Sequence, residues 1–154
     1  MHTDRANAPN SFVQVWYRGM TKVPTPERSM PAILISDRDD RTIAIPLHHL
    51  EGDLLRCALQ GKDVEPQPYY LLMNCLEKLG GELVSVRIIY TPTYDLSTQL
   101  ILLTKEGADV EVSAPCSEAI ICALVAGVPI HVEEKLMADI SAVRSSKGRR
   151  LQNE

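Results

Sequence analysis

The sequence predicts a single α+β domain that consists of two copies of one strand-strand-strand-helix unit in tandem. In each half of the chain, short apolar runs of strand composition precede a segment with helical apolar periodicity. The helical segments also match each other, since Leu55–Leu59 reads LRCAL and Ile120–Leu124, 65 positions later, reads IICAL. At the same offset Asp53 corresponds to Glu118, so we interpret the chain as an internal duplication.

Three strands are expected in the first half. Strand composition marks Phe12–Tyr17, Ala32–Ser36 and Thr42–Ile45. The second and third flank the polar segment Asp37–Asp40, which is typical of a hairpin turn. A proline-containing loop is expected from Lys22 to Met30.

Two helices are expected to complete the first unit. The first is expected over His48–Gln60 and the second over Pro68–Leu79, where Pro68 occupies a favoured first-turn position. Gly61 and Gly80–Gly81 are placed to end them. The spacing predicts inward faces made of Leu50, Leu54, Leu55, Ala58 and Leu59 in the first helix, and of Leu72, Cys75, Leu76 and Leu79 in the second.

The second half repeats the plan. A strand is expected over Leu83–Tyr90, and a hairpin is expected around Lys105–Gly107. The following helix is apolar nearly all round, which indicates burial, and Gly127 ends it. The remaining elements are the hairpin strands Leu100–Leu103 and Val110–Val112, the buried helix Ser117–Ala126, an extended piece Pro129–Val132 and a last amphipathic helix Glu133–Ile140.

Composition limits the function classes. One Trp, one Phe and five Tyr in 154 residues leave an aliphatic core and few platforms for base stacking. Residues 1–140 carry a net charge of about −7 and residues 141–154 about +3. An acidic body argues against tight, nonspecific nucleic-acid binding, so a nucleic-acid partner is disfavoured on charge alone. The basic tail is interpreted as solubilising, with contact to an anionic partner as the alternative.

The ends and the cysteines indicate a cytoplasmic protein. No apolar run has the length of a membrane span, and the polar N-terminus is unlike a signal peptide, so no membrane partner is expected. Residues 1–11 are expected to be disordered, 12–141 to form the domain (units 12–80 and 82–141), and 142–154 to be a flexible tail. Because no CxxC pair occurs, we interpret the cysteines as reduced core residues, and no cofactor is required for folding; they are Cys57, Cys75, Cys116 and Cys122.

The start of the first helix concentrates titratable side chains. His48 to Asp53 contains two imidazoles and two carboxylates, with Glu51 near the apolar seam and Asp53 pointing away from it. A metal site would therefore need a ligand from elsewhere, such as Glu118, and oxygen ligands would suit Mg²⁺ or Mn²⁺. The alternative is that the carboxylates stabilise the helix N-terminus and that His49 is an exposed loop residue.

The other candidate residues lie at the starts of two later helices. Ser117 and Glu118 put a hydroxyl and an acid before an apolar helix and join Glu51 as candidate catalytic residues. Ser117 also has the type and position of an N-cap, and it lacks the Gly-x-Ser-x-Gly elbow of a serine nucleophile. Tyr69 and Tyr70 are candidates for substrate binding together with His49, and a buried tyrosine pair is the alternative.

Three stretches of the chain carry a resemblance to a known family. Ser117–Ala119 with Ile120, followed by the turn Ala126–His131, is similar to a Ser-Asp-Ala-Ile helix start that ends in an Ala-Gly-x-Pro-Ile turn. The other two stretches are Ile43–Pro46 leading to Glu51 and Gly61, and Leu71 to Gly81. Over about residues 12–140 the chain resembles the bifunctional nuclease domain family.

The resemblance implies both a fold and an activity. The implied fold has duplicated strand-strand-strand-helix-helix units that share a mixed, half-barrel-like sheet with helices packed against it, often in a homodimer. The implied activity is a nuclease that hydrolyses phosphodiester bonds of DNA or RNA. Carried over by position, Glu51 matches the family's acidic residue before the first helix, and Glu118 matches the Asp of the Ser-Asp-Ala start.

Departures from the family pattern keep a second hypothesis open. Tyr69-Tyr70 stands where the family usually has His-Asp, Glu118 is one methylene longer than Asp, and Cys116 replaces a Pro. If the His-Asp pair takes part in catalysis, this copy keeps the fold without the activity. The two hypotheses are therefore a metal-assisted nuclease, a hydrolase, and a non-catalytic dimeric binding or regulatory module.

Overall fold

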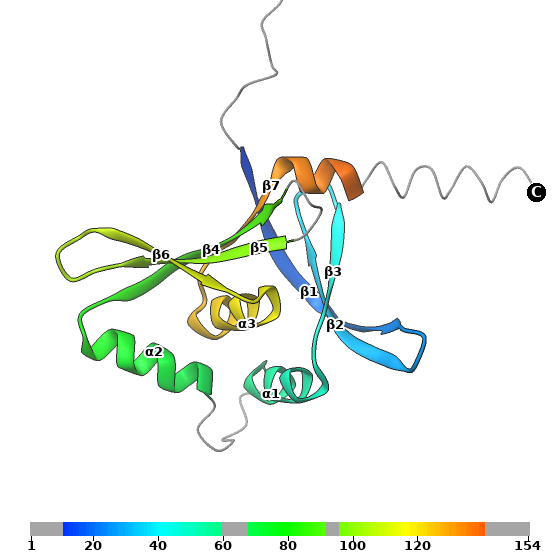
Figure 1. Cartoon of the computed structure of the whole chain (residues 1–154), viewed down its shortest axis with the longest axis horizontal. Coiled ribbons are helices and arrows are strands. Elements are labelled where there is room, and N and C mark those ends of the chain that lie inside the picture. The colour runs from blue at the N-terminus through cyan, green and yellow to red at the C-terminus, as the bar shows by residue number, and fades with distance from the viewer. Residues whose placement is uncertain (1–10, 60–67, 92–95, 141–154) are drawn as a thin grey trace, which may run out of the picture.

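The computed structural model describes residues 11–59, 68–91 and 96–140, in which seven strands form one mixed sheet in the order β3-β2-β1-β7-β4-β5-β6. The helices lie against this sheet (Figure 1). The strands are β1 (Phe12–Pro24), β2 (Ser29–Ser36), β3 (Thr42–Pro46), β4 (Glu82–Tyr90), β5 (Leu96–Leu103), β6 (Asp109–Ala114) and β7 (Ile130–Glu133). The helices are α1 (His49–Leu59), α2 (Pro68–Lys78) and α3 (Cys116–Ala126), and residues 134–140 are also helical.

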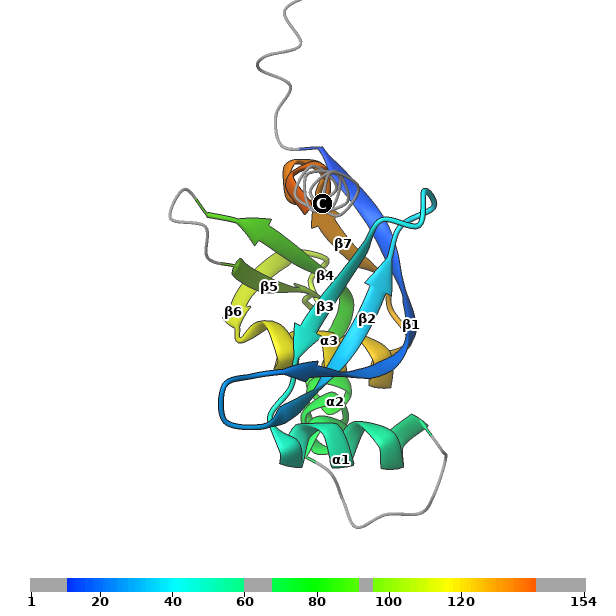
Figure 2. The same ribbon diagram turned by 90° about the vertical axis from the view of Figure 1, so that its right-hand side faces the viewer.

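The sheet has two antiparallel meanders joined through β7. β1, β2 and β3 form the first meander, and β4, β5 and β6 form the second. β7 pairs antiparallel with β1 over Phe12–Val15 and parallel with β4 over Val86–Ile88 (Figure 2). The predicted α+β class and mixed sheet are therefore confirmed, while the origin of the halves by duplication remains a prediction.

The predicted loop between the first two strands is shorter than expected. β1 continues to Pro24 and β2 begins at Ser29, so the expected loop from Lys22 to Met30 is wrong. The two strands stay paired up to the register pair Pro24↔Ser29. Pro24 and Pro26 lie at the strand end and in the turn, where the ladder requires no N–H. Pro31 lies inside β2 and is paired with Lys22, so a proline did not by itself mark the limit of pairing.

Helix α3 is the centre of the core, as its composition predicted. Ala119–Ala123 is buried throughout, and residues from both meanders pack with it, including Ile33 and Val86. Figure 1 shows α3 beneath the sheet, between the two meanders. Gly127 ends the helix in a left-handed conformation with φ of 70°, which a glycine adopts without strain.

The predicted inward face of α1 is only partly right. Leu55 is fully buried and Leu54 is half-buried. Leu50 and Leu59 were expected to face inward, but they are 65% and 45% exposed. α1 contacts α3 and β2 at the margin of the core, so only a narrow stripe of the helix is covered.

The predicted inward face of α2 is right only for Leu76. None of the residues of α2 is buried, and Leu72 and Cys75 are exposed instead of packed, as is Leu79 beyond the helix end. The side chains that pack against the core are Tyr69, Met73 and Leu76. The polar residues Asn74, Glu77 and Lys78 gather on one side of α2, and the remaining apolar arc is too wide for its periodicity to select the part that meets α3 and β4.

The cysteines are all free, but only Cys122 belongs to the buried core. Cys57 and Cys116 are half-buried, and Cys75 is exposed. In the described parts of the chain, no helix combines the length and apolar character that a bilayer crossing requires. The expectations for residues 1–10, Gly61 and the basic tail lie outside the described residues.

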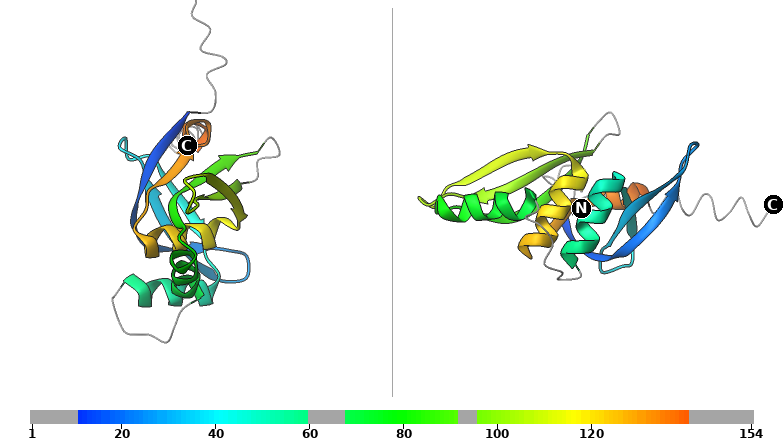
Figure 3. Two further views of the ribbon diagram at one scale, coloured as in Figure 1. Left: turned by 90° about the vertical axis from the view of Figure 1, so that its left-hand side faces the viewer. Right: turned by 90° about the horizontal axis from the view of Figure 1, so that it is seen from below.

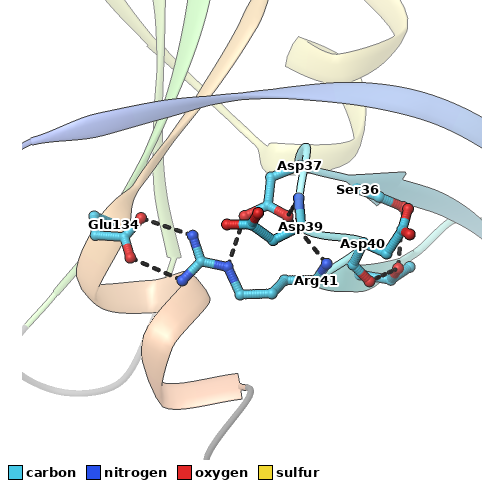
Figure 4. Close-up of polar contacts among 7 residues, drawn as sticks. Ser36, Asp37, Asp39, Asp40, Arg41 and Glu134 are labelled. Atoms are coloured by element: carbon cyan, nitrogen blue, oxygen red, sulfur yellow. Dashed lines mark hydrogen bonds and ion pairs between the residues drawn. The ribbon is translucent and has the colours of Figure 1, made fainter.

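A partly buried ionic network ties the turn between β2 and β3 to the helical segment 134–140 (Figure 4). Asp37 Oδ1 accepts hydrogen bonds from the N–H groups of Asp39 and Arg41, both at 3.0 Å, and Arg41 Nε donates to Asp37 Oδ2 at 2.6 Å. Two guanidinium nitrogens of Arg41 donate to the two carboxylate oxygens of Glu134, both at 2.8 Å. Asp40, with φ of 58°, closes the turn.

This network depresses the pKa values of both carboxyl groups. Burial acts to raise the pKa of Asp37, but the hydrogen bonds and the charge of Arg41 outweigh it, so that the pKa is lowered. The hydrogen bond from Arg41 likewise lowers the pKa of Glu134, and the two carboxylates raise the pKa of Arg41. A carboxyl group with a lowered pKa in the folded state stabilises the fold above its unfolded pKa of about 4, and that stabilisation is lost as pH falls.

We predict that Arg41→Gln lowers the free energy of unfolding by about 2 kcal/mol at neutral pH, because Asp37 then keeps a buried charge without its cation. Chemical denaturation at a series of pH values measures this. The wild type is expected to lose its advantage over the variant as pH falls below about 5. Arg56→Gln is the control, because Arg56 pairs with Asp53 in solvent at 3.1 Å and should change stability by less than ~0.5 kcal/mol. Equal losses in both variants would contradict the prediction.

Candidate functional site

The first turns of α1, α2 and α3 meet, and they bring together four of the residues that the sequence singled out. Ser117 Oγ of α3 donates a hydrogen bond to Glu51 Oε2 of α1 at 2.9 Å. Tyr69 of α2 experiences the charges of both Glu51 and Glu118. Figure 3 shows α1 and α2 on either side of α3. We call Glu51, Tyr69, Ser117 and Glu118 the helix-start cluster.

Glu51 is held by two neutral donors. Its Oε1 accepts the N–H of His48 at 3.0 Å, which is the return bond of a capping box at the start of α1. Its Oε2 accepts the hydroxyl of Ser117. Glu51 therefore caps its own helix, as the structural alternative expected, and it also contacts α3. Asp53 points elsewhere and pairs with Arg56 in solvent, so the predicted separation of the two acids is confirmed.

Ser117 is not the N-cap of α3. The helix begins one residue earlier than expected, at Cys116, and Pro115 occupies the cap position without a side-chain hydrogen bond. Ser117 thus lies inside the first turn, and its hydroxyl is directed to Glu51 instead of to its own backbone. Burial raises the pKa of the neighbouring Cys116, so that its thiol stays protonated near neutral pH.

Tyr69 supplies the protonated donor of the helix-start cluster. It is half-buried and packs against the core. Burial first, and then the negative charges of Glu51 and Glu118, raise its pKa to about 12, with a smaller contribution from Cys122. A phenol in these surroundings remains a hydrogen-bond donor throughout the physiological pH range.

The other two candidates for substrate binding lie apart from these contacts. Tyr70 is 43% exposed and lines a hollow of about 470 Å³ with Met73, Leu83 and Val125. The predicted buried tyrosine pair is therefore wrong for Tyr70, because consecutive helical residues point in different directions. His49 is exposed at the first residue of α1.

The donor set of the helix-start cluster consists of hard oxygen atoms. Among the described residues, no group of three or more His, Cys, Asp or Glu side chains is arranged to hold a metal ion. Mg²⁺ retains several waters and needs only one or two carboxylates from the protein. Carboxylates such as those of Glu51 and Glu118 are the ligand type that such an ion takes from a protein, whereas a tetrahedral zinc site would need further nitrogen or sulfur ligands.

Sequence reasoning did not identify a second polar hollow, beside β1. It has a volume of about 340 Å³ and is lined by Gln14, Trp16, Arg38 and Asp39 among others. The guanidinium carbon of Arg38 lies 5.9 Å from the centroid of the Trp16 ring. The available signal was the alternation of Phe12, Gln14 and Trp16, which places their side chains on one face of a strand.

Comparison with protein families gives a match over most of the chain. A family model described as the bifunctional nuclease domain matches residues 32–145. A search of curated proteins found no match. The matched region begins in β2 and contains all four residues of the helix-start cluster.

We predict that Glu118→Gln and Glu51→Gln each lower the pKa of Tyr69 toward the ordinary value near 10, because each removes a negative charge that opposes phenolate formation. Tyrosine ionisation, followed by ultraviolet absorbance during alkaline titration, measures this. Tyr69→Phe is expected to remove the highest-pH transition, whereas Tyr70→Phe, the matched control, should leave it in place. A Tyr69 transition unaffected by both glutamate variants would show that the carboxylates do not face the phenol.

Proposed function

The chain belongs to the bifunctional nuclease domain family, and on this premise we propose that it hydrolyses phosphodiester bonds of DNA or RNA at the helix-start cluster. The hydrogen bond between Ser117 and Glu51 is the observation that supports this location most directly, because it joins the beginnings of α1 and α3. Tyr69 and Glu118 lie beside that contact.

In this proposal Glu51 and Glu118 would hold a hydrated divalent ion, Mg²⁺ or Mn²⁺. Such an ion supplies an activated water and neutralises charge on the phosphoryl oxygens. Ser117 fixes the side-chain conformation of Glu51 through its hydroxyl. The N-termini of the helices add partial positive charge, which favours carboxylates and phosphate at this point.

Tyr69 takes the role of a neutral donor. Its phenol is protonated under physiological conditions and lies near both carboxylates. It is suited to donate a hydrogen bond to a phosphate oxygen without adding charge, and a donor aimed at developing negative charge stabilises a transition state. The family resemblance implies a histidine at position 69, so the phenol of Tyr69 stands in place of an imidazole.

We predict that purified protein releases nucleotides from DNA or RNA in the presence of Mg²⁺ or Mn²⁺, and that Glu118→Gln lowers the rate by about 100-fold or more. Asp53→Asn is the matched control, because Asp53 lies near the same helix start but pairs with Arg56 in solvent. Its rate should stay within about twofold of wild type. Cleavage that survives both a chelator and Glu118→Gln would indicate a contaminant and would count against the proposal.

The exposed face of α2 favours a second candidate function, a non-catalytic dimeric binding or regulatory module. Tyr70, Leu71 and Leu72 are 43%, 61% and 47% exposed, and Leu79 beyond the helix end is 78% exposed. Exposed apolar patches on soluble proteins mark interaction sites. No charged residue occurs from Pro68 to Leu76, so two acidic copies could approach each other here with little repulsion.

We predict that the protein is a dimer in sedimentation or light-scattering measurements at micromolar concentration and that Leu71→Glu makes it monomeric. A charge placed at the centre of an apolar interface loses its hydration on association, which opposes dimer formation. Leu50→Glu is the matched control, because it places the same charge on α1, where Leu50 is 65% exposed. The Leu50→Glu protein should remain dimeric. A wild-type monomer, or equal dissociation of both variants, would exclude α2 as the interface.

A further inference from the structure

The single Phe and the single Trp of the chain both lie on the sheet face that points away from α3. Val13 and Val15 of β1 pack toward the core, so the alternation of the strand directs Phe12, Gln14 and Trp16 to the opposite face. Phe12 and Trp16 are half-buried there and not enclosed by the core. Both rings are therefore partly accessible to a ligand.

Each of these rings has an arginine over it. The guanidinium carbon of Arg87, from β4, lies 5.5 Å from the centroid of Phe12, and that of Arg38 lies 5.9 Å from the centroid of Trp16. Such distances allow cation–π attraction. Phe12 and Trp16 are four residues apart in one strand, which separates them by about 13 Å. An aromatic ring beside a cation, repeated along a surface, is the arrangement by which proteins bind single-stranded nucleic acid.

A polar row continues from these rings across five adjacent strands. The strand registers place Gln14 beside His131, His131 beside Arg87, Arg87 beside Gln99, and Gln99 beside Ser113. We call these five residues, with Phe12 and Trp16, the open face. The row is about 19 Å long, which corresponds to about five stacked nucleotides at ~3.4 Å each.

The groups on the row suit hydrogen bonding to bases. Burial and the charge of Arg87 lower the pKa of His131, so its imidazole is neutral near physiological pH and can both donate and accept. Gln14 and Gln99 carry amides with the same double capacity. Arg87 is the cation on this part of the face that can meet a phosphate.

The far end of the row leads to the helix-start cluster. Ser113 is the penultimate residue of the edge strand β6, and Ser117 and Glu118 follow it in the first turn of α3. Figure 1 shows β6 running into α3 at the edge of the sheet. A strand lying on the row and turning around this edge would reach the carboxylates. Asp109 and Glu111 are nearer the other end of β6, where their charges disfavour a phosphate path.

The near end of the row opens into the hollow of about 340 Å³ beside Trp16. Asp37 and Arg41 also line this hollow, but they pair with each other, and Arg41 pairs with Glu134 as well. Arg38 is exposed and is directed to the Trp16 ring, so it can turn toward a phosphate while a base stacks on the indole.

We propose that the open face binds single-stranded nucleic acid, with bases stacked on Phe12 and Trp16 and with phosphates on Arg38 and Arg87. This inference rests on the proposed function, because it takes the bound single strand to be the substrate of the nuclease. Arg38 and Arg87 are the cations placed over the two rings, and the strand register puts the carboxylate of Glu133 beside Phe12. The affinity is therefore expected to be modest, in agreement with the acidic body of the chain.

The test uses full-length Glu118→Gln protein, in which cleavage is suppressed, and a fluorescent oligothymidylate of about eight nucleotides. We expect the fluorescence anisotropy of the oligonucleotide to rise to saturation as protein is added. We also expect the oligonucleotide to quench the fluorescence of Trp16, which is the only tryptophan in the chain. Arg38→Gln and Arg87→Gln should each weaken binding about 5- to 10-fold, since each loses a phosphate contact. The slope of log K against log salt should change from about −1.4 to about −0.7 in each variant.

Arg56→Gln is the control, because it removes the same charge from α1, where Arg56 pairs with Asp53 in solvent. It should stay within about twofold of the parent affinity. Absence of saturable binding, or equal weakening by Arg56→Gln, would overturn the proposal. If binding depends on Arg38 and Arg87 but the wild type cleaves nothing, then the open face stands and the nuclease proposal fails. If cleavage depends on Glu118 and neither arginine variant changes its rate or KM, then the nuclease proposal stands and the open-face proposal fails.

Discussion

Burial of α3 is the constraint on which the rest of this structure depends. The helix is apolar nearly all round, so it can be stable only where other elements cover it, and both meanders, α1 and α2 contribute to that cover. The sheet must curve around it, and β7 must return between β1 and β4 to close the gap. Because the body of α3 is enclosed, its first turn is fixed in space, and the starts of α1 and α2 are fixed beside it.

The carboxylates of this protein have two kinds of hydrogen-bond partner, a cation or neutral donors. Asp37 and Glu134 share the guanidinium of Arg41, and their charges serve to hold a turn and a helix together. Glu51 accepts hydrogen bonds from a backbone amide and a hydroxyl, both of which are neutral. A charge held in place by neutral donors remains available to a cation or a water. The kind of partner therefore distinguishes the ionic network of Asp37 and Glu134 from the candidate site at Glu51, which the mere presence of acidic residues does not.

Two surfaces with different chemistry follow from this fold. The helix side has acids and a phenol, together with the exposed apolar face of α2. The open face of the sheet has aromatic rings, arginines and amides. The C-terminal end of β6 joins the two, since it leads directly into the first turn of α3. The net negative charge of the whole chain is therefore not the charge of the open face, which is the surface proposed to bind a polyanion.

The sequence by itself determined the elements whose signals are local. The hairpin turns at Asp37–Asp40 and Lys105–Gly107, the buried α3 and its end at Gly127 follow from turn chemistry and composition, and the family could be inferred from three short stretches. The tertiary structure alone decided which faces are covered and which side chains meet. α2 has one polar side, with Asn74, Glu77 and Lys78, and its apolar arc is wide, so its pattern could not specify a narrow inward stripe. Ser117 reaches Glu51 across 66 positions and Arg41 reaches Glu134 across 93, and contacts of that range leave no periodic trace, because they depend on how the sheet curves around a helix that both halves must bury.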